Sequence, residues 1–578
     1  MYFRHFHLLL ISLAMLCMLN ACQKINEHAL LTYTLTPVLD GASGNSLIIE
    51  IDFTSETDGE TDVLLGQAWA DEQTPWTRFK DISITSEGKA LPFTRKDSRL
   101  TIHHEANTPL KLTYHLHQKD GREADGDSGF FYAPVLQDEI YHLIGFSSLA
   151  IPSVETRNEI GQRAARVRLN WNLPENWQSA ASFDVEGQTT LPLDKILRTA
   201  LTAGEFNITS RPIGEKQLNL IMMGEWSFSE TQLADKLSRI LTALNTSWDD
   251  EPLDYQVSLL PLPPLPNASS FTGTGLNHAF AAVGTPNIEL DFLTAFLTHE
   301  MTHDWIPNRL GSFPNCDEEE KNKDINCAAA IYWFSEGFTD YFSLSLLKEN
   351  GLISQSDFTL KTNEILRNYY MSPARNVPNT DIQKDFWNDP DVERQPYLRG
   401  FLLALNWNQE IITISNKQKN MADALRGLKD KAQKNSLLPE LTPSYLTTHF
   451  SRWVGRDLTS DLTSYITNGE TIIPTPENLG GCETLTMRPS FRYNLGFDVD
   501  ASLGSGIFSG VRENSNAYRA GLRNGMKFLS KVKGGGGDTT RPIVLGVNDA
   551  GEDIEVSYLP IDGEGVDVPQ YVTSDSKC

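Results

Sequence analysis

The motif HEMTH, from His299 to His303, constrains the fold of this chain more than any other stretch of its sequence. Apolar residues flank it at helical spacing, which predicts a buried amphipathic helix. Because four residues make about one helical turn, His299 and His303 project from one face of that helix and can together hold a zinc ion. Glu300 lies beside the first ligand, where it can take a proton from water instead of binding the metal. The flanking apolar residues are Phe292, Leu293, Phe296 and Leu297.

A third zinc ligand is predicted downstream, because catalytic zinc sites usually take three protein ligands and leave one position for water. Glu336 lies in the middle of the apolar, helix-like segment IYWFSEGFTDYFSLSLL. A carboxylate inside an apolar helix is costly unless it is paired or bound to metal. Asp340 follows one turn later and could accept a hydrogen bond from the outer nitrogen of a zinc-bound histidine. The alternative, two satisfied core histidines and a capping Glu336, leaves Glu300 and Asp340 unexplained.

These two segments, HEMTHDW and WFSEGFTDYF, resemble the glycyl aminopeptidase family of zinc peptidases, which are relatives of aminopeptidase N. Glu336 lies 33 residues after His303, a spacing similar to that family's pattern. The resemblance implies a thermolysin-like, mostly helical α+β catalytic domain. It also implies one zinc ion per chain, held by His299, His303 and Glu336, and hydrolysis of peptide bonds with Glu300 as general base.

Two looser matches extend the resemblance. In GTGLNH, Gly275 and Asn277 occupy the family's substrate-binding positions, and Asn277 replaces a glutamate that can pair with the free amino group of a peptide. Because a neutral amide offers no counter-charge, an endopeptidase of relaxed end-specificity stays open beside an aminopeptidase. In QPYLRG, Tyr397 matches the family's catalytic tyrosine, whose phenol would hydrogen-bond the oxyanion formed on the attacked carbonyl. A tyrosine that only packs is the alternative.

The length and charge of the chain set outer limits. A chain of 578 residues is too long for one core, so about three domains are expected. The formal net charge of −26 argues against a nucleic-acid partner. Residues 23–185 alternate apolar and polar residues and predict an all-β, sandwich-like domain. Residues 186–480 are assigned to the zinc peptidase domain and residues 481–578 to a PDZ-like β domain.

The first 22 residues, MYFRHFHLLLISLAMLCMLNAC, predict a secretory signal, since the apolar run is too short for a comfortable membrane span. Their tail, LNAC, resembles a bacterial lipobox and makes Cys22 the lipidated first residue of the mature protein. Gln23 after the cysteine then indicates the outer membrane of a Gram-negative cell, so the predicted location is the bacterial envelope, with membrane contact only through the lipid. An ordinary signal peptide cut near Ala21 is the alternative.

Four cysteines remain beyond the leader, and in an oxidising compartment they allow three pairings. We favour the pairing Cys316–Cys327, which would close the loop between the two zinc helices. The second bridge, Cys482–Cys578, would then bracket the C-terminal domain. Free buried thiols are the alternative.

Residues 489 to about 565 resemble a PDZ domain, which glycyl aminopeptidases carry at this place. The backbone N–H groups of a PDZ carboxylate-binding loop can hold the C-terminus of a peptide. The residues that match this loop are Asn494, Leu495, Gly496 and Phe497. A unit that only packs on the catalytic domain and binds nothing is the alternative.

The hypothesis is therefore a zinc metallopeptidase of the glycyl aminopeptidase type that acts on peptide or protein substrates. A hypothesis from a different class is a non-catalytic envelope lipoprotein that binds peptides through the PDZ-like unit and the β domain. The intact set His299, Glu300, His303 and Glu336 argues against it, because a protein that only binds need not keep Glu300.

Overall fold

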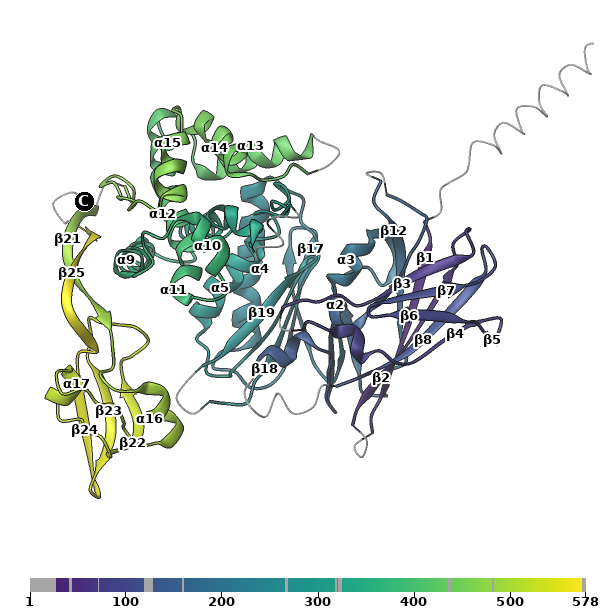
Figure 1. Cartoon of the computed structure of the whole chain (residues 1–578), viewed down its shortest axis with the longest axis horizontal. Helices are drawn as coiled ribbons and strands as arrows, with labels where there is room; N and C mark the ends of the chain where they lie inside the picture. Colours follow the sequence, from purple (N-terminus) through teal and green to yellow (C-terminus); the bar gives the residue numbers. More distant parts are fainter. Residues whose placement is uncertain are drawn as a thin grey trace, which may run out of the picture.

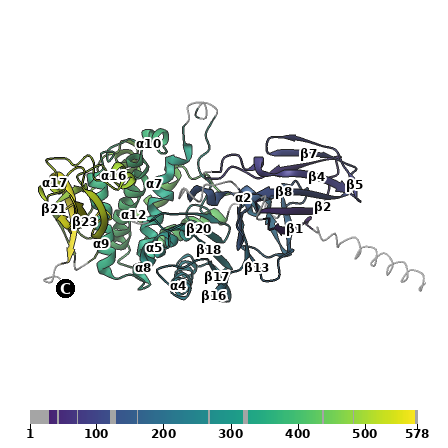
Figure 2. The ribbon, with the colours of Figure 1, turned by 90° about the horizontal axis from the view of Figure 1, so that it is seen from below.

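The chain folds, in this computed structural model, into three parts that lie in a row (Figure 1). The N-terminal β-sheets occupy one end, a sheet covered by helices lies in the middle, and small β-sheets occupy the other end; a view from below shows the same order (Figure 2). This confirms the expected multidomain arrangement. The structure describes residues 28–40, 44–70, 72–118, 128–158, 161–265, 269–317, 320, 325–434, 438–480 and 483–573.

The N-terminal part consists of β-sheets because its strands alternate apolar and polar residues. In β2 and β8, nearly every second side chain is buried, so one face of the sheet packs on a core. Three sheets have the strand orders β14-β12-β1-β2-β8-β4-β5, β11-β3-β7-β6 and β13-β15-β10-β9. The strands are β1 (Leu30–Val38), β2 (Ser46–Thr54), β3 (Glu60–Leu65), β4 (Lys80–Ser86), β5 (Lys89–Ala90), β6 (Phe93–Lys96), β7 (Arg99–His103), β8 (Pro109–His117), β9 (Val135–Leu136), β10 (Ile140–Ile144), β11 (Ala150–Pro152), β12 (Ala164–Trp171), β13 (Gln178–Ala181), β14 (Glu186–Pro192) and β15 (Ala200–Gly204). Short helices η1 (Pro75–Arg78), η3 (Ser128–Tyr132), α2 (Gly145–Ser148) and α3 (Leu193–Leu197) connect them.

The central sheet joins the N-terminal part to the helices because both of its faces are buried. Its strand order is β16-β17-β18-β20-β19, and every residue of β20 is buried. Phe280 and Ala282 pack in the core shared with the helices, whereas Ala281 and Val283 pack in the core of the N-terminal part. The strands are β16 (Ile208–Ile213), β17 (Lys216–Met222), β18 (Tyr255–Pro261), β19 (Phe271–Leu276) and β20 (Ala279–Gly284).

Helices build the rest of the central part. The first, α4 (Glu230–Trp248), begins with a capping box in which Ser229 and Gln232 satisfy each other's backbone N–H groups. Its apolar side faces the sheet and α5 (Leu290–Thr302). The others are η4 (Cys327–Ile331), α7 (Tyr332–Ser335), α8 (Gly337–Glu349), α9 (Gln355–Met371), α10 (Asn379–Asp385), α11 (Pro390–Glu393), α12 (Gln395–Ile414), α13 (Met421–Gln433), α14 (Pro443–Val454), α15 (Thr459–Asp461) and the π-helix η5 (Leu462–Thr467).

The C-terminal part docks on α9 through a long two-stranded ribbon. The Asn363 side chain donates to the Tyr571 carbonyl and accepts from the Tyr571 N–H, each at 2.8 Å. Beyond the ribbon, three strands in the order β22-β23-β24 enclose a small core of their own. The elements are β21 (Glu483–Tyr493), α16 (Val499–Ser505), α17 (Asn516–Arg519), β22 (Lys527–Lys533), β23 (Ile543–Asp549), β24 (Glu552–Tyr558) and β25 (Ile561–Thr573).

The N-terminal β-sheets do not end at residue 185, the predicted end of the β domain, because β14 pairs with β12 and β15 pairs with β10. Among the described residues, no helix combines the length and the apolar character needed to cross a bilayer. Cys22, Cys482 and Cys578 lie outside the described residues, so the lipid anchor and the second disulfide stay predictions.

Candidate zinc site

The first two zinc ligands lie at the C-terminal end of the predicted helix, His299 within α5 and His303 as its C-cap. Leu293, Leu297 and Met301 point into the main core of the central part, which fixes the opposite face toward a cleft. One part of the prediction is wrong: Phe292 is not buried. Its side chain is 56% exposed and lines the cleft wall, because it lies on the same helical side as His299.

Glu336 is placed at a break between two helices rather than inside one. It is the C-cap of α7 and the N-cap of α8, so the expected continuous helix is interrupted at the ligand. The break allows α8 to approach α12 closely: a Cβ on Gly337 would lie 2.4 Å from the Gly400 Cα. A side chain at either glycine would therefore push apart the two helices that carry Glu336 and Tyr397.

The three predicted ligand atoms converge on one point. The Nε2 atoms of His299 and His303 lie 3.0 Å apart, and they lie 3.5 and 3.4 Å from Glu336 Oε2. A tetrahedral zinc ion with bonds of about 2.0–2.2 Å separates its ligand atoms by about 3.4 Å. The residues therefore fit one zinc ion, and the zinc prediction is confirmed on this geometry.

The outer nitrogens of both histidines are held in place. His299 Nδ1 lies 2.7 Å from Asp340 Oδ1, and His303 Nδ1 lies 2.7 Å from the Ile306 carbonyl oxygen. When each ring is neutral, these oxygens accept from Nδ1–H and Nε2 presents its lone pair to the other ring. Two lone pairs 3.0 Å apart repel unless a cation lies beside them, which again fits a metal ion.

The charges around the site favour a cation there. Burial lowers the pKa of His299, but Asp340 and Glu336 more than offset burial, and the pKa ends well above its usual value. Burial raises the pKa of Glu336, yet the two histidines hold it well below its usual value, so this ligand is ionised. Burial raises the pKa of Glu300, which increases its affinity for a proton.

A cleft opens in front of the ligands. Glu300, Asp340 and Tyr397 line a cavity of about 660 Å³ together with His299 and Glu336. The ring of Tyr397, in the first turn of α12, lies 6.3 Å from the ring of His299. Burial, followed by the charges of Glu336 and Asp340, raises the pKa of Tyr397, so its phenol stays protonated and can donate a hydrogen bond.

Gly275 and Asn277 lie at the end of the edge strand β19. A Cβ on Gly275 would meet open space, and the Asn277 N–H donates to the Arg198 carbonyl at 2.8 Å. The strand is held against the N-terminal part, since Trp69 Nε1 donates to Thr274 Oγ1 at 2.8 Å. The two cavities that His299 lines do not include either predicted substrate residue, so their contact with substrate stays a prediction.

The family comparison covers the core of this site. Residues 293–395 match the profile described as M61 glycyl aminopeptidase, and this range contains His299, Glu300, His303, Glu336 and Asp340. Over this range the chain is similar to the M61 glycyl aminopeptidases. Together with the convergent ligands, this match makes the protein a zinc metallopeptidase of the aminopeptidase type. Among curated protein sequences, none matches the chain.

One solved structure shares the overall fold of this chain. An aminopeptidase N family protein from Idiomarina loihiensis aligns over 94% of this chain and 98% of its own, with a TM-score of 0.63 and 14% identity. An M1 zinc metallopeptidase from Deinococcus radiodurans aligns over 78% of this chain and 95% of its own, with a TM-score of 0.46 and 14% identity. At this identity the first similarity concerns the fold alone.

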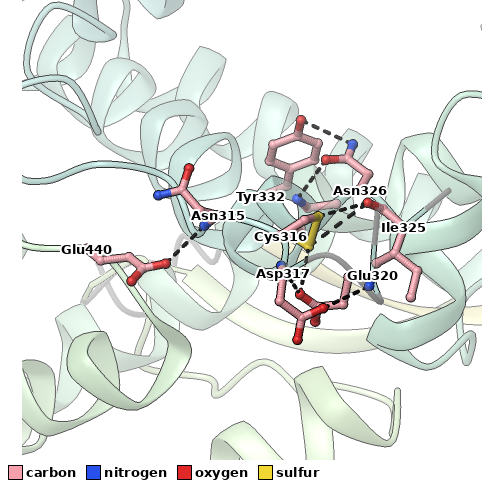
Figure 3. The surroundings of a disulfide bond; sticks show 10 residues. Asn315, Cys316, Asp317, Glu320, Ile325, Asn326, Tyr332 and Glu440 are labelled. Atoms are coloured by element: carbon pink, nitrogen blue, oxygen red, sulfur yellow. Dashed lines mark hydrogen bonds between the residues drawn. A yellow bond between two sulfur atoms is a disulfide. The ribbon is translucent and has the colours of Figure 1, made fainter. Parts of the chain in front are cut away.

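A disulfide joins Cys316 and Cys327, as favoured from the sequence, with Cα atoms 5.4 Å apart (Figure 3). It closes the loop between the two zinc segments. Asn326 caps η4 by accepting from the Ala329 N–H, and its Nδ2 donates to the hydroxyl of Tyr332 at 3.3 Å. The bridge therefore lies next to the helical segment that leads to Glu336.

The predicted PDZ loop lies between β21 and α16. The Gly496 N–H donates to the Asn494 side chain at 2.7 Å, and Arg512 donates to the same oxygen at 2.7 Å. A helix, α16, follows Phe497, whereas adding a peptide strand to a sheet needs an exposed strand edge. Ligand binding by Asn494, Leu495, Gly496 and Phe497 stays a prediction.

Two features of the cleft were missed from the sequence. The first is the Ile306 carbonyl, since backbone groups carry no sequence signal. The second is Arg394, which lines the cleft with Tyr397 and His299. Its position three residues before Tyr397 is about one helical turn and could have suggested a shared face.

Proposed function

We propose that this protein removes residues from the free N-terminus of peptides, with Glu300 as general base and Tyr397 as oxyanion donor. The observation that carries the proposal is the convergence of His299, His303 and Glu336 within 3.5 Å of one another, with Glu300 facing the same cleft. A protein that only binds peptides has no need of this arrangement.

Each residue of the site has its own role in the proposed hydrolysis. His299, His303 and Glu336 hold the metal, and Asp340 orients the first histidine through Nδ1. When bound there, zinc polarises the scissile carbonyl and lowers the pKa of a water molecule. Glu300 accepts the proton of the attacking water and delivers it to the leaving amine, a transfer that its raised pKa favours.

Tyr397 acts on the oxygen of the attacked carbonyl. Its protonated phenol donates a hydrogen bond to the oxygen that becomes negative in the transition state. Pro396 within the first turn of α12 and the close contact between Gly400 and Gly337 fix the start of this helix against α8. The donor and the zinc ligand Glu336 therefore belong to one packed unit.

Asn277 lacks the charge of the family glutamate, so it offers no counter-charge to the free amino group of a peptide. Acidic side chains line the cleft nevertheless and can pair with an α-amino group. Those other than the zinc ligand Glu336 and the general base Glu300 are Asp291, Asp340, Asp357, Glu364 and Glu393. An endopeptidase of relaxed end-specificity is the second candidate, and the neutral Asn277 is the observation that favours it.

One experiment separates the two candidates. Zinc-loaded protein that lacks residues 1–22 is offered one peptide library in two forms, with free and with acetylated N-termini, and cut sites are identified by mass spectrometry. We expect single residues to be released from the free form only. Internal cuts in both forms would instead establish an endopeptidase, and no cuts in either would remove the peptidase assignment.

We also propose that the mature protein is anchored by lipid at Cys22 in the bacterial envelope. The support is the lipobox-like LNAC at the end of the apolar leader. Labelling with a fatty-acid analogue should mark the wild-type chain and not Cys22→Ser. Equal labelling of both would contradict the anchor.

For the C-terminal part, we propose a PDZ-like unit. Its support is the match of the loop 494–497 and the positive φ of Gly496, +81°. If the loop holds peptide C-termini, Phe497→Asp should weaken binding of a peptide acid to this part without changing zinc content. Unchanged binding would leave the unit a packing module.

For the sheet architecture, we propose that the N-terminal part forms a sandwich and that the central part is thermolysin-like. The pairing of apolar sheet faces in one shared core supports the first assignment.

A further inference from the structure

Next to the cleft in front of the zinc ligands lies a second pocket, the arginine pocket, which is lined by Arg367, Arg394 and Arg492. His299, Tyr397 and Arg394 line a cavity of about 510 Å³. Arg394, Asn368 and Leu398 also line a neighbouring pocket of about 330 Å³. The two cavities share these three side chains, so they adjoin one another at Arg394.

Three guanidinium groups and one carboxylate make up the charged lining of this second pocket. Arg367 comes from α9, Arg394 from the start of α12 and Arg492 from β21, and the acid is Asp391. Such an excess of positive charge is unusual in a chain whose net charge is −26. The net charge of the pocket lining is therefore opposite in sign to the net charge of the whole protein.

The arginines are not used in ion pairs. Within the described part of the chain, Arg367, Arg394 and Arg492 have no carboxylate partner, and only Arg492 makes a side-chain hydrogen bond, to the Met371 carbonyl at 3.3 Å. Arg456, which lies outside the cleft, is by contrast paired with Glu410 at 2.7 Å. Guanidinium groups with free donors are suited to bind a carboxylate, which they can grip with two N–H groups.

The distance from the reacting carbonyl suits a short peptide. Arg394 precedes Tyr397 by three residues, and one helical turn rises about 5.4 Å. An extended peptide advances about 3.3–3.6 Å per residue. A carboxylate that reaches Arg394 therefore lies one to a few residues beyond the bond that is cut beside Tyr397.

The C-terminal part forms the far wall of the pocket and holds it in place. Arg492 lies on β21, the strand paired with β25, which docks on α9 through Asn363 and Tyr571. Arg367, in the same helix α9, follows Asn363 by one turn. The ribbon contact thus sets the separation between Arg492 and Arg367.

We propose that this pocket binds the C-terminal carboxylate of a short peptide substrate, so that Arg367, Arg394 and Arg492 select peptides that end a few residues beyond the cut. The inference rests on the proposed peptidase function. An acidic side chain offers the same chemistry, but the wall formed by the C-terminal part favours a chain that ends in the pocket.

The test measures binding, so that its outcome does not depend on turnover. The full mature chain with Glu300→Gln is titrated calorimetrically with three peptides: Ala-Phe-Ala with a free C-terminus, its C-terminal amide, and Ala-Phe-Glu amide. The titrations are repeated with Arg394→Gln or Arg367→Gln added. The matched control is Arg488→Gln. Arg488 is exposed and lies on β21, the strand of Arg492, but it does not line the pocket.

We expect the free acid to bind about tenfold more tightly than the amide, which is the low end of what a hydrogen bond to a charged group contributes. Arg394→Gln and Arg367→Gln should reduce this ratio to near one, whereas Arg488→Gln should leave it unchanged. Equal affinity for acid and amide would overturn the proposal. If Ala-Phe-Glu amide binds as tightly as the free acid, the terminal carboxylate is not what the pocket selects, and the proposal is likewise overturned.

Failure of the peptidase function would look different. Wild-type, zinc-loaded protein that cuts no peptide, while the acid-to-amide ratio persists and depends on Arg394, would remove the proposed activity and keep the carboxylate pocket. Cleavage of peptide acids and amides at equal kcat/KM, with equal affinities in the titration, would keep the activity and remove the pocket.

Discussion

Removal of Asp340 should weaken zinc binding, because this residue is the only side chain that orients a zinc-binding histidine in the described site. Its Oδ1 lies 2.7 Å from His299 Nδ1, whereas His303 is oriented by the Ile306 carbonyl, which mutation cannot delete. In Asp340→Ala the ring of His299 loses its fixed tautomer and orientation, while all three ligands remain.

The size of the effect follows from similar contacts. Loss of an outer partner of a metal-binding histidine typically costs about 10–100-fold in metal affinity, or about 1.4–2.7 kcal/mol. The Asp340 side chain is 34% exposed, so water can replace part of the contact, and we expect the lower half of that range. Asp340→Asn keeps an oxygen that can accept from Nδ1–H and should lose less.

The assay is competition for zinc between the protein and a chromophoric chelator, followed by kcat/KM at saturating zinc. Asp340→Ala should show a zinc Kd raised about 10–30-fold. Asp381→Asn, an exposed acid on α10, is the control and should bind zinc like wild type. A zinc Kd within threefold of wild type for Asp340→Ala would refute the role assigned to this carboxylate.

Three further predictions concern the oxyanion donor, a buried histidine and the disulfide. Tyr397→Phe should lower kcat about 100-fold or more with little change in KM, and an unchanged kcat would exclude the phenol as donor. Burial lowers the pKa of His142 to about 3, while its unfolded value is about 6.5, so the unfolded state binds more protons below pH 6.5. The free energy of unfolding should therefore fall by about 2 kcal/mol between pH 7 and pH 5. His142→Leu should remove that dependence in denaturation experiments. Cys316→Ser together with Cys327→Ser should destabilise the loop by up to about 3 kcal/mol, given a sequence separation of 11, and an unchanged Tm would contradict the bond.

The zinc site could be predicted because its ligands lie in short motifs that are recognisable in the sequence. The motif from His299 to His303 fixes two ligands by helical geometry alone, and Glu336 stands out as an acid in an apolar segment. The break at Glu336 could not be predicted, since the apolar spacing continues through this residue and the contact of Gly337 with Gly400 joins segments that are far apart in sequence. Phe292 was predicted to be buried because it recurs at helical spacing with the apolar residues of α5. Its side chain lines the cleft instead and is 56% exposed.

The remaining misses are tertiary. The docking of β25 on α9 through Asn363 depends on a side chain that looks like any polar residue of a helix surface. The arginine pocket unites α9, α12 and β21, and no local pattern brings these segments together. The helix α16 after the PDZ-like loop was not predicted; it begins where Asp498 caps it by accepting from the Ala501 N–H.

The most direct test of the account is the Glu300→Gln variant, examined for zinc content and for cleavage in the same preparation. Because Glu300 lies beside the ligands without being one, we predict one zinc ion per chain, as in wild type, and a loss of kcat by at least about 1,000-fold. Near-normal cleavage with zinc retained would contradict the assignment of Glu300 as the base. Loss of zinc from this variant would show that Glu300 helps to bind the metal, contrary to the site described.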